Sequence, residues 1–190
     1  KETGSFAQAQ KDVQKIAANT RGDLSATAAL YGNFARNAKS LGISQGEVAR
    51  ATETVAKTFK ISGAGAVETS QGIRQLVQAL QSGVLRGDEF NTMMESSPRL
   101  AKLLADSLGV PISSLRTMAE AGDLTSDKLT KAFTDKRFTD GIDAEFKRLP
   151  VTFEEAMGQV HNAAVTTFGA FDRGGEFSTA LANFVTDGSK

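Results

Sequence analysis

The side chains of this sequence that could do acid–base chemistry are carboxylates and a single imidazole. Its 190 residues include 22 Asp and Glu, one His and no Cys. Without Cys the chain has no thiol nucleophile, no disulfide and no zinc-thiolate site, and one His cannot form a multi-histidine metal site. Glycoside hydrolysis would need two carboxylates held close together. The composition therefore disfavours an enzyme.

Glu95 is the strongest candidate for a general acid. It falls near the end of a helix predicted to begin around Gly87, where a negative charge is unfavourable by about 0.3–1 kcal/mol. We expect the free amides at the start of the next helix, at Ser97 and Pro98, to compensate this charge. A structural role is therefore favoured over catalysis, because the spacing fixes no second acid beside Glu95. His161 lies off the apolar stripe of its own helix and is expected to be solvated.

Three short matches to known motifs have simpler explanations. Arg21-Gly22-Asp23 and Arg86-Gly87-Asp88 spell an adhesion tripeptide, but each lies at a predicted helix junction, where Gly ends one helix and Asp caps the next. Gly63-Ala64-Gly65 begins like a dinucleotide-binding loop, yet Glu68 stands where a third glycine is needed. The acidic stretch 140–145 resembles a calcium loop, but around its glycine the first and third ligand positions fall on Lys and Phe.

The charge balance excludes further classes. The chain has 22 Lys and Arg against 22 Asp and Glu, so its net charge is zero. Nucleic-acid grooves need a basic stripe, and none is present.

No apolar run approaches the ~18 residues of a membrane span, and no signal peptide opens the chain. Because the sequence begins at Lys1 rather than Met, we expect a fragment of a longer protein.

Helical periodicity recurs along the whole chain, and nothing resembles a strand longer than two or three residues. We predict an all-α fold: a compact bundle of about eight to ten mostly short helices with longer helical extensions at the termini. The expected divisions are an N-terminal helical extension over 1–22, a compact helical domain over 23–149, and C-terminal helices over 150–190 that lead toward the rest of a longer protein.

Residues typical of helix ends support this prediction. Ser44 with Glu47 and Thr152 with Glu155 have the spacing of a capping box, and Ser97 followed by Pro98 marks another helix start. Glycines that follow apolar-periodic stretches are expected to end helices in the left-handed conformation; these are Gly42, Gly83, Gly109, Gly122 and Gly141.

Two loops share one pattern. The segments 83–90 and 122–129 both read Gly, any residue, Leu, two loop residues, Asp, any residue, apolar residue. We predict that Leu85 and Leu124 are both buried and that their backbones exchange a bridge-like hydrogen bond. The C-terminal phenylalanines at helical spacing are expected to form core or an oligomer seam; these are Phe153, Phe168, Phe171, Phe177 and Phe184.

One long pattern resembles the tape measure domain of the tail length tape measure proteins of bacteriophages and prophages. It runs through residues 75–80, 83–91 and 95–98 and continues to 125, with Gly, Pro and Phe at fixed offsets. The resemblance covers about residues 24–135, and Pro111 replaces a more usual small polar residue. Its motif residues are Gln78, Gly83, Leu85, Gly87, Phe90, Asn91, Glu95, Pro98, Gly109, Leu115, Gly122 and Leu124.

This resemblance implies a structural protein of the virion tail, present in the bacterial host cytoplasm during assembly, with no catalysis and no cofactor. The partners it implies are other tail proteins (tube, assembly chaperones, tail-tip or baseplate components), with self-association as a further possibility. Short helices would fold to a radius of gyration of ~16 Å, whereas one continuous helix would reach about 285 Å. We therefore expect a docking module rather than the ruler itself. The alternative is a helical cell-wall-hydrolase-like module with Glu95 as acid.

Overall fold

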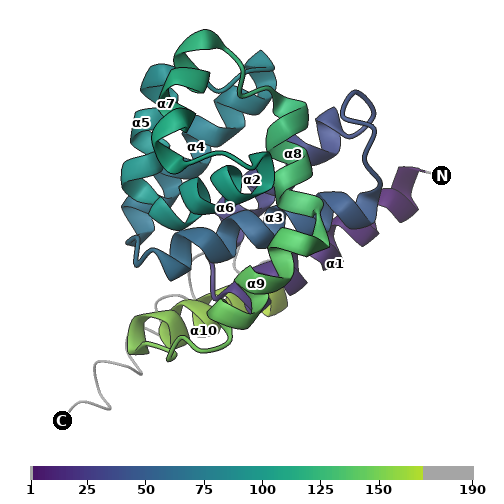
Figure 1. Cartoon of the computed structure of the whole chain (residues 1–190). Coiled ribbons are helices and arrows are strands. Elements are labelled where there is room, and N and C mark those ends of the chain that lie inside the picture. The colour runs from purple at the N-terminus through teal and green to yellow at the C-terminus, as the bar shows by residue number, and fades with distance from the viewer. Residues whose placement is uncertain (1, 169–190) are drawn as a thin grey trace. The chain divides into compact units, whose positions relative to one another are not determined.

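The structure is a computed structural model in which residues 2–168 are described (Figure 1). This part of the chain folds into ten α-helices and contains no sheet, which confirms the predicted all-α class. The helices are α1 (Glu2–Thr20), α2 (Leu24–Asn37), α3 (Gln45–Ile61), α4 (Ala66–Ser82), α5 (Gly87–Ser96), α6 (Pro98–Leu108), α7 (Ile112–Ala121), α8 (Ser126–Thr134), α9 (Lys136–Phe146) and α10 (Phe153–Phe168). Residues Lys1–Val151 form one compact unit and Thr152–Lys190 form a second.

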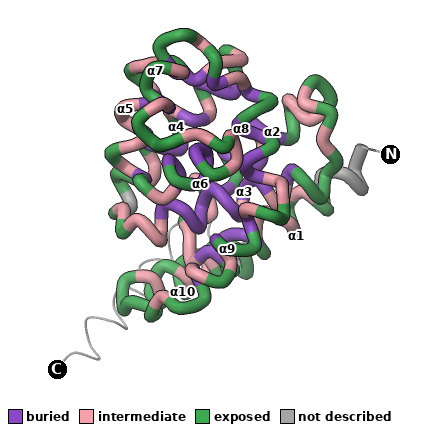
Figure 2. Tube along the Cα trace, in the orientation of Figure 1, coloured by how far each residue is buried: buried purple, intermediate pink, exposed green. Residues whose placement is uncertain are grey.

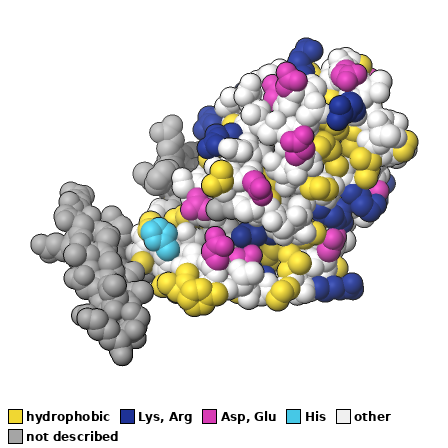
Figure 3. Space-filling model, turned by 90° about the vertical axis from the view of Figure 1, so that its left-hand side faces the viewer, with side chains coloured by type: hydrophobic (Ala, Val, Ile, Leu, Met, Phe, Trp, Pro, Cys, Tyr) yellow, Lys and Arg dark blue, Asp and Glu magenta, His cyan; other side chains and the backbone are white. Residues whose placement is uncertain are grey.

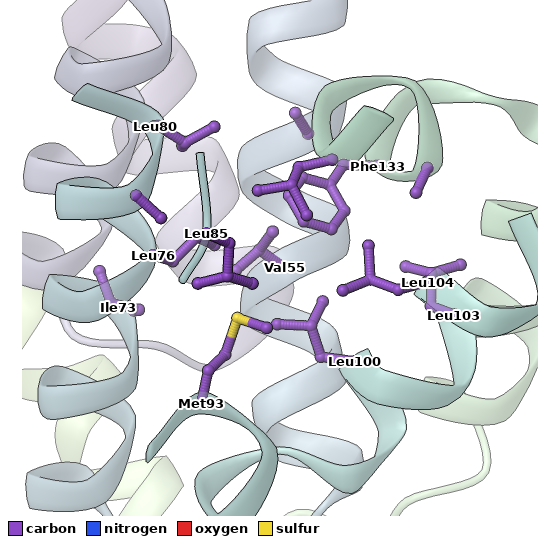
Figure 4. Close-up of a cluster of buried hydrophobic side chains, with 14 of the residues drawn as sticks. Val55, Ile73, Leu76, Leu80, Leu85, Met93, Leu100, Leu103, Leu104 and Phe133 are labelled. Carbon is purple, nitrogen blue, oxygen red and sulfur yellow. The ribbon is translucent and has the colours of Figure 1, made fainter. Parts of the chain in front are cut away.

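Helix α3 is the centre of the first unit. It packs against α1, α2, α6, α8 and α9, and it is buried along most of its length (Figure 2). Small and β-branched side chains let neighbouring helices approach it closely, since Ala51 and Val55 are fully buried. The hydrophobic core lies between α3 and the surrounding helices and contains Leu76, Met93 and Leu100 (Figure 4).

Aromatic side chains fill the wider gaps of this core. Phe34 of α2 and Phe133 of α8 are fully buried and meet edge to face, with ring centroids 6.3 Å apart. Such aromatic pairs contribute about 0.5–1.5 kcal/mol beyond the burial of their area. The contact joins two helices that are distant in the sequence but pack on the same central helix, α3.

The N-terminal helix is part of the compact unit, which differs from the extension expected over residues 1–22. Helix α1 packs against both α2 and α3. Its last turns carry the buried residues Ile16 and Ala17. Tyr31 Oη also donates a hydrogen bond of 2.9 Å to Asp12 Oδ2, which ties α1 to α2. Burial of these apolar side chains makes α1 a structural member of the bundle.

Arg21 connects the end of α1 to the end of the same unit. Its guanidinium donates to the carbonyl oxygens of Leu149 and Pro150 at 3.0 and 2.9 Å and stacks over the ring of Phe146. Arg21 also has a positive φ of 52°, which a non-glycine residue rarely adopts. These contacts hold the first and last parts of the unit together.

The predicted helix caps are mostly present. Ser44 and Glu47 form a full capping box, and Ser97 caps α6 with Pro98 in the first turn. Asp23 caps α2 as expected. Gly141 is an exception, because it lies inside α9 and does not end a helix.

The other predicted helix-ending glycines adopt positive φ angles; they are Gly42, Gly83, Gly109 and Gly122. In the second adhesion-like tripeptide the capping role differs from the prediction. Arg86 is the N-cap residue of α5, and the carboxylate of Glu89, rather than Asp88, accepts its backbone N–H.

Helix α9 is held on α3 by ion pairs that the sequence did not reveal. Asp143 accepts hydrogen bonds from Arg50 at 2.6 Å and from Lys57 at 2.7 Å. Lys57 is almost completely buried and also pairs with Glu53. Glu145 of α9 accepts a bond of 2.6 Å from Arg99 of α6. The acids of the stretch 140–145 therefore bind basic side chains rather than a calcium ion.

The pKa of Asp143 reflects two opposing effects. Partial burial raises the pKa of this carboxyl, but hydrogen bonds from Lys57 and Arg50 outweigh burial and bring it below its ordinary value. A carboxyl with a lowered folded-state pKa stabilises the fold above its unfolded pKa, about 3.9. That contribution disappears as the pH falls through the folded-state value.

We predict that Asp143→Asn lowers the free energy of unfolding by about 1–3 kcal/mol at pH 7, because Lys57 would lose a charged partner while nearly buried. The difference from the parent should narrow as the pH falls below about 4. Denaturant unfolding at several pH values measures both effects. Asp106→Asn is the control, since this exposed carboxylate pairs with the exposed Lys102 and should change stability by less than about 0.5 kcal/mol. Equal effects of the two variants at pH 7 would contradict the prediction.

The second unit contains α10 among its described residues. Thr152 and Glu155 exchange the hydrogen bonds of the predicted capping box. His161 is exposed, as expected. Phe153 is 82% exposed, so of the two roles expected for it, core or an oligomer seam, the core role is wrong within the described part of the chain. Of the other phenylalanines named with it, Phe168 is the last residue of α10, and Phe171, Phe177 and Phe184 lie outside the described residues.

Candidate functional site at the crossing of two loops

The two loops with the shared pattern cross each other inside the first unit. Gly83 directly follows the last residue of α4, and Gly122 directly follows that of α7. These two glycines have φ angles of 85° and 76°. A left-handed residue turns the chain sharply at a helix end, and glycine adopts this conformation without steric cost. Each chain then runs extended for a few residues before the next helix begins.

Backbone hydrogen bonds join the two extended segments. The N–H of Leu85 donates to the carbonyl of Leu124 at 2.8 Å, and the N–H of Ser126 donates to the carbonyl of Gly83 at 2.9 Å. Val84 and Thr125 form the corresponding isolated antiparallel bridge. The predicted hydrogen bond between the two leucine backbones is confirmed.

Both leucines point into the core. Leu85 and Leu124 are each 0% exposed. In Figure 4, Leu85 lies among Leu76, Met93 and Val55. Burying one such side chain contributes about 1.5–3 kcal/mol, and pairing the backbone groups avoids the cost of leaving them unsatisfied. The crossing therefore joins α4 and α5 to α7 and α8.

The remaining motif residues divide into core and surface. Phe90 and Leu115 are buried like the two leucines. Pro98 is exposed at the first turn of α6, and Gly109 ends that helix with a φ of 67°. The side-chain oxygen of Asn91 is buried without a hydrogen-bond partner among the described residues.

Two motif residues, Gln78 and Gly87, line a polar groove of about 550 Å³ between α4 and the start of α5. The other residues lining it are Gln75, Arg86, Asp88, Glu89 and Thr92. One of its two acidic groups already has a structural role, because Glu89 accepts the backbone N–H of Arg86 and lies 3.5 Å from the amide of Gln78. The groove offers hydrogen-bonding groups for a partner rather than a pair of free carboxylates.

Glu95 does not have the expected role. Its side chain is exposed at the end of α5, and no hydrogen bond to it is found among the described residues. The amides at the start of α6 use hydroxyl oxygens instead: Leu100 N–H donates to Ser97 Oγ and Arg99 N–H donates to Ser62 Oγ. The predicted compensation of Glu95 by this helix start is therefore wrong, because the hydroxyl oxygens of Ser97 and Ser62 accept from these amides.

The described residues hold no cluster of three or more His, Asp or Glu side chains that could bind a metal ion. Their helices also include none long and apolar enough to cross a membrane. Basic and acidic side chains alternate on the face shown in Figure 3.

Gly72 is a residue that sequence analysis missed. It lies in the middle of α4 directly against the buried ring of Phe59 in α3, so a Cβ at this position would collide with two ring atoms. A glycine inside a helical pattern is the one available signal, since it costs about 1 kcal/mol in helix propensity. That signal does not identify the neighbour that requires it.

Comparison with known proteins gives one match. A family model described as "Tape measure protein" matches residues 1–173. The chain belongs to the tape measure protein family. The match is wider than the resemblance over residues 24–135, and it includes α1 and α10. No curated protein and no solved structure matches the chain. Membership in the tape measure family indicates a structural role in a phage tail.

We predict that Leu85→Asp destabilises the tape measure unit severely, by more than about 4 kcal/mol, because it buries an unpaired charge at the loop crossing. Thermal melting followed by circular dichroism measures the change. Gln78→Ala is the control, since this exposed motif residue makes only a long hydrogen bond. A Leu85→Asp variant that melts like the parent would show that the crossing is not part of the core.

A second prediction compares one substitution at two helical glycines. Gly72→Ala should destabilise the fold by about 1–3 kcal/mol, because the ring of Phe59 cannot move without disturbing the core. Gly141→Ala in α9 meets open space and should stabilise by up to about 1 kcal/mol through helix propensity. Denaturant unfolding of both variants tests the pair. Stabilisation by Gly72→Ala would contradict the close contact between Gly72 and the ring of Phe59.

Proposed function

We propose that this chain is a compact structural module of a phage or prophage tail tape measure protein. In this proposal it serves tail assembly and tail length determination through docking contacts, while other parts of the protein supply the length. The module acts in the virion tail and in the host cytoplasm during assembly. Membership in the tape measure family supports a location in a phage tail. The compact folding of the first unit supports a docking role rather than a role in spanning length.

One contact carries the argument for docking over length. Arg21 and Pro150 are 129 positions apart in the sequence, yet the Arg21 guanidinium lies 2.9 Å from the Pro150 carbonyl oxygen. A continuous helix would separate the same residues by about 190 Å, at 1.5 Å per residue. Residues within this unit therefore contribute little to the distance that the chain can span.

The proposed partners are other tail proteins: tube subunits, assembly chaperones, and tail-tip or baseplate components. Self-association is a further possibility. The polar groove beside Gln75 and Gln78 and the exposed residues of α10 are surfaces open to such contacts. The alternative, a cell-wall-hydrolase-like module, has less support because Glu95 is exposed with no second carboxylate fixed beside it.

An insertion in the intact protein tests the docking role. The loop at Lys39 and Ser40 is exposed, and surface loops tolerate long insertions at low cost. We predict that inserting about 28 Gly and Ser residues here leaves tail length unchanged in electron micrographs. The same residues would add about 42 Å if each counted as one helical step. Tails lengthened in that proportion would overturn the proposal.

The control is the loss of the fold itself. Leu85→Asp in the intact protein should prevent assembly of tails, whereas Leu85→Met should give tails of the parental length, because it conserves volume and polarity. A turbidity assay on peptidoglycan addresses the alternative. Clearing that Glu95→Gln abolishes would favour the hydrolase.

A further inference from the structure

Apolar side chains gather on one exposed face of α10. Phe153 is 82% exposed, Met157 43% and Val160 51%, and Ala164 continues the same face as a half-buried residue. Single exposed apolar residues are common on protein surfaces, but contiguous ones mark contact sites. In Figure 3, exposed apolar side chains lie near the single His of the chain. We call Phe153, Met157, Val160 and Ala164 the α10 stripe.

The spacing of the α10 stripe is that of a helix–helix seam. Its members follow one another at intervals of four, three and four residues. This alternation is the 3.5-residue repeat of the a and d positions in coiled coils. Between Ala156 and Phe168 the helix carries no Lys, Arg, Asp or Glu, so two identical helices could approach along the stripe without charge repulsion.

We propose that α10 pairs in antiparallel orientation with α10 of a second copy of this chain. A two-fold axis then passes near the middle of the stripe, and both copies contribute the same residues to the contact. This inference is independent of the proposed role in tails, because it rests on the stripe and its flank alone.

The sizes of the stripe residues favour antiparallel pairing. When the two helices run in opposite directions, Phe153 of each copy meets Ala164 of the other, and Met157 meets Val160. Each layer then combines a larger with a smaller side chain, which gives even packing. In parallel pairing two phenylalanines would meet at one end and two alanines at the other. That arrangement would force the helices apart at Phe153 and leave a gap at Ala164.

The polar side chains beside the α10 stripe also favour antiparallel pairing. Glu154 and His161 are both exposed and lie two helical turns apart on one side of the stripe. Antiparallel pairing brings Glu154 of one copy beside His161 of the other, and it does so twice. The imidazole can donate a ring N–H to the carboxylate in either of its protonation states. In parallel pairing Glu154 of one copy and His161 of the other would lie about two helical turns apart along the axis and would not meet.

The contact area is small, so the dimer should be weak. Stable protein interfaces bury about 1,200–2,000 Å² in total, and four side chains from each copy bury less. We expect the 190-residue chain to be a monomer at low micromolar concentration and to dimerise reversibly near about 0.1–1 mM. Sedimentation equilibrium over this range measures the association.

Matched substitutions test which surface is used. Met157→Lys places a charge in the seam and should raise the dimer dissociation constant at least about tenfold. Thr166→Lys adds the same charge on the opposite face of α10 and should leave it unchanged. Glu154→Lys should weaken the dimer, and adding His161→Glu should restore it by exchanging the charges. A parent chain that stays monomeric up to about 1 mM would overturn the proposal, as would equal effects of Met157→Lys and Thr166→Lys.

Cross-linking tests the orientation, because the chain contains no Cys of its own. A mixture of Phe153→Cys and Ala164→Cys chains should oxidise to the mixed disulfide dimer, with little of either self-linked dimer. Thr166→Cys reports random collisions. Ala164→Cys chains that link mainly to one another would show parallel pairing and would refute the antiparallel arrangement.

Discussion

The first unit depends on one constraint: five of its helices, α5 to α9, are too short to be stable alone and must be held in place by packing. Isolated helices shorter than about 12–15 residues are only marginally stable in water, and α5 to α9 are all shorter than this. The crossing at Leu85 and Leu124 meets this constraint directly. It places a buried side chain from each loop in the shared core and pairs backbone groups that would otherwise lack partners. Four helices become mutually dependent through one contact.

The same constraint explains the placement of charge. A buried ammonium such as that of Lys57 is costly unless it is paired, and here it binds carboxylates from its own helix and from α9. The network fixes the orientation of α9 on α3, and Arg21 then joins the end of this region to the end of α1. The ends of the unit are therefore fixed by polar contacts, and its interior by apolar burial.

Local patterns in the sequence were sufficient for the elements and for the loop crossing. These patterns are helical spacing, the capping box at Ser44 and the glycines that follow helix ends. Each is a short-range signal whose physical meaning does not depend on the rest of the chain. The predictions that were wrong concern features that depend on the three-dimensional structure. Gly141 was predicted to end a helix but lies within α9. The amides expected to compensate Glu95 donate to Ser97 and Ser62 instead. Helix α1 packs into the bundle through Ile16 and Ala17. For Glu95 and α1 a neighbour distant in the sequence, Ser62 or the surface of α2 and α3, decided between options that were locally equivalent.

A compact unit followed by α10 also bears on how a tape measure protein can count length. A ruler needs each residue to add a constant increment, and a continuous helix provides this at about 1.5 Å per residue. The unit of residues 1–151 returns on itself, so we expect insertions in its loops to leave the spanned distance unchanged, whereas insertions in a continuous helical segment must extend it. Under the docking role proposed above, the unit would give the protein a fixed contact with its partners, and the counted length would come from helical segments elsewhere in the chain.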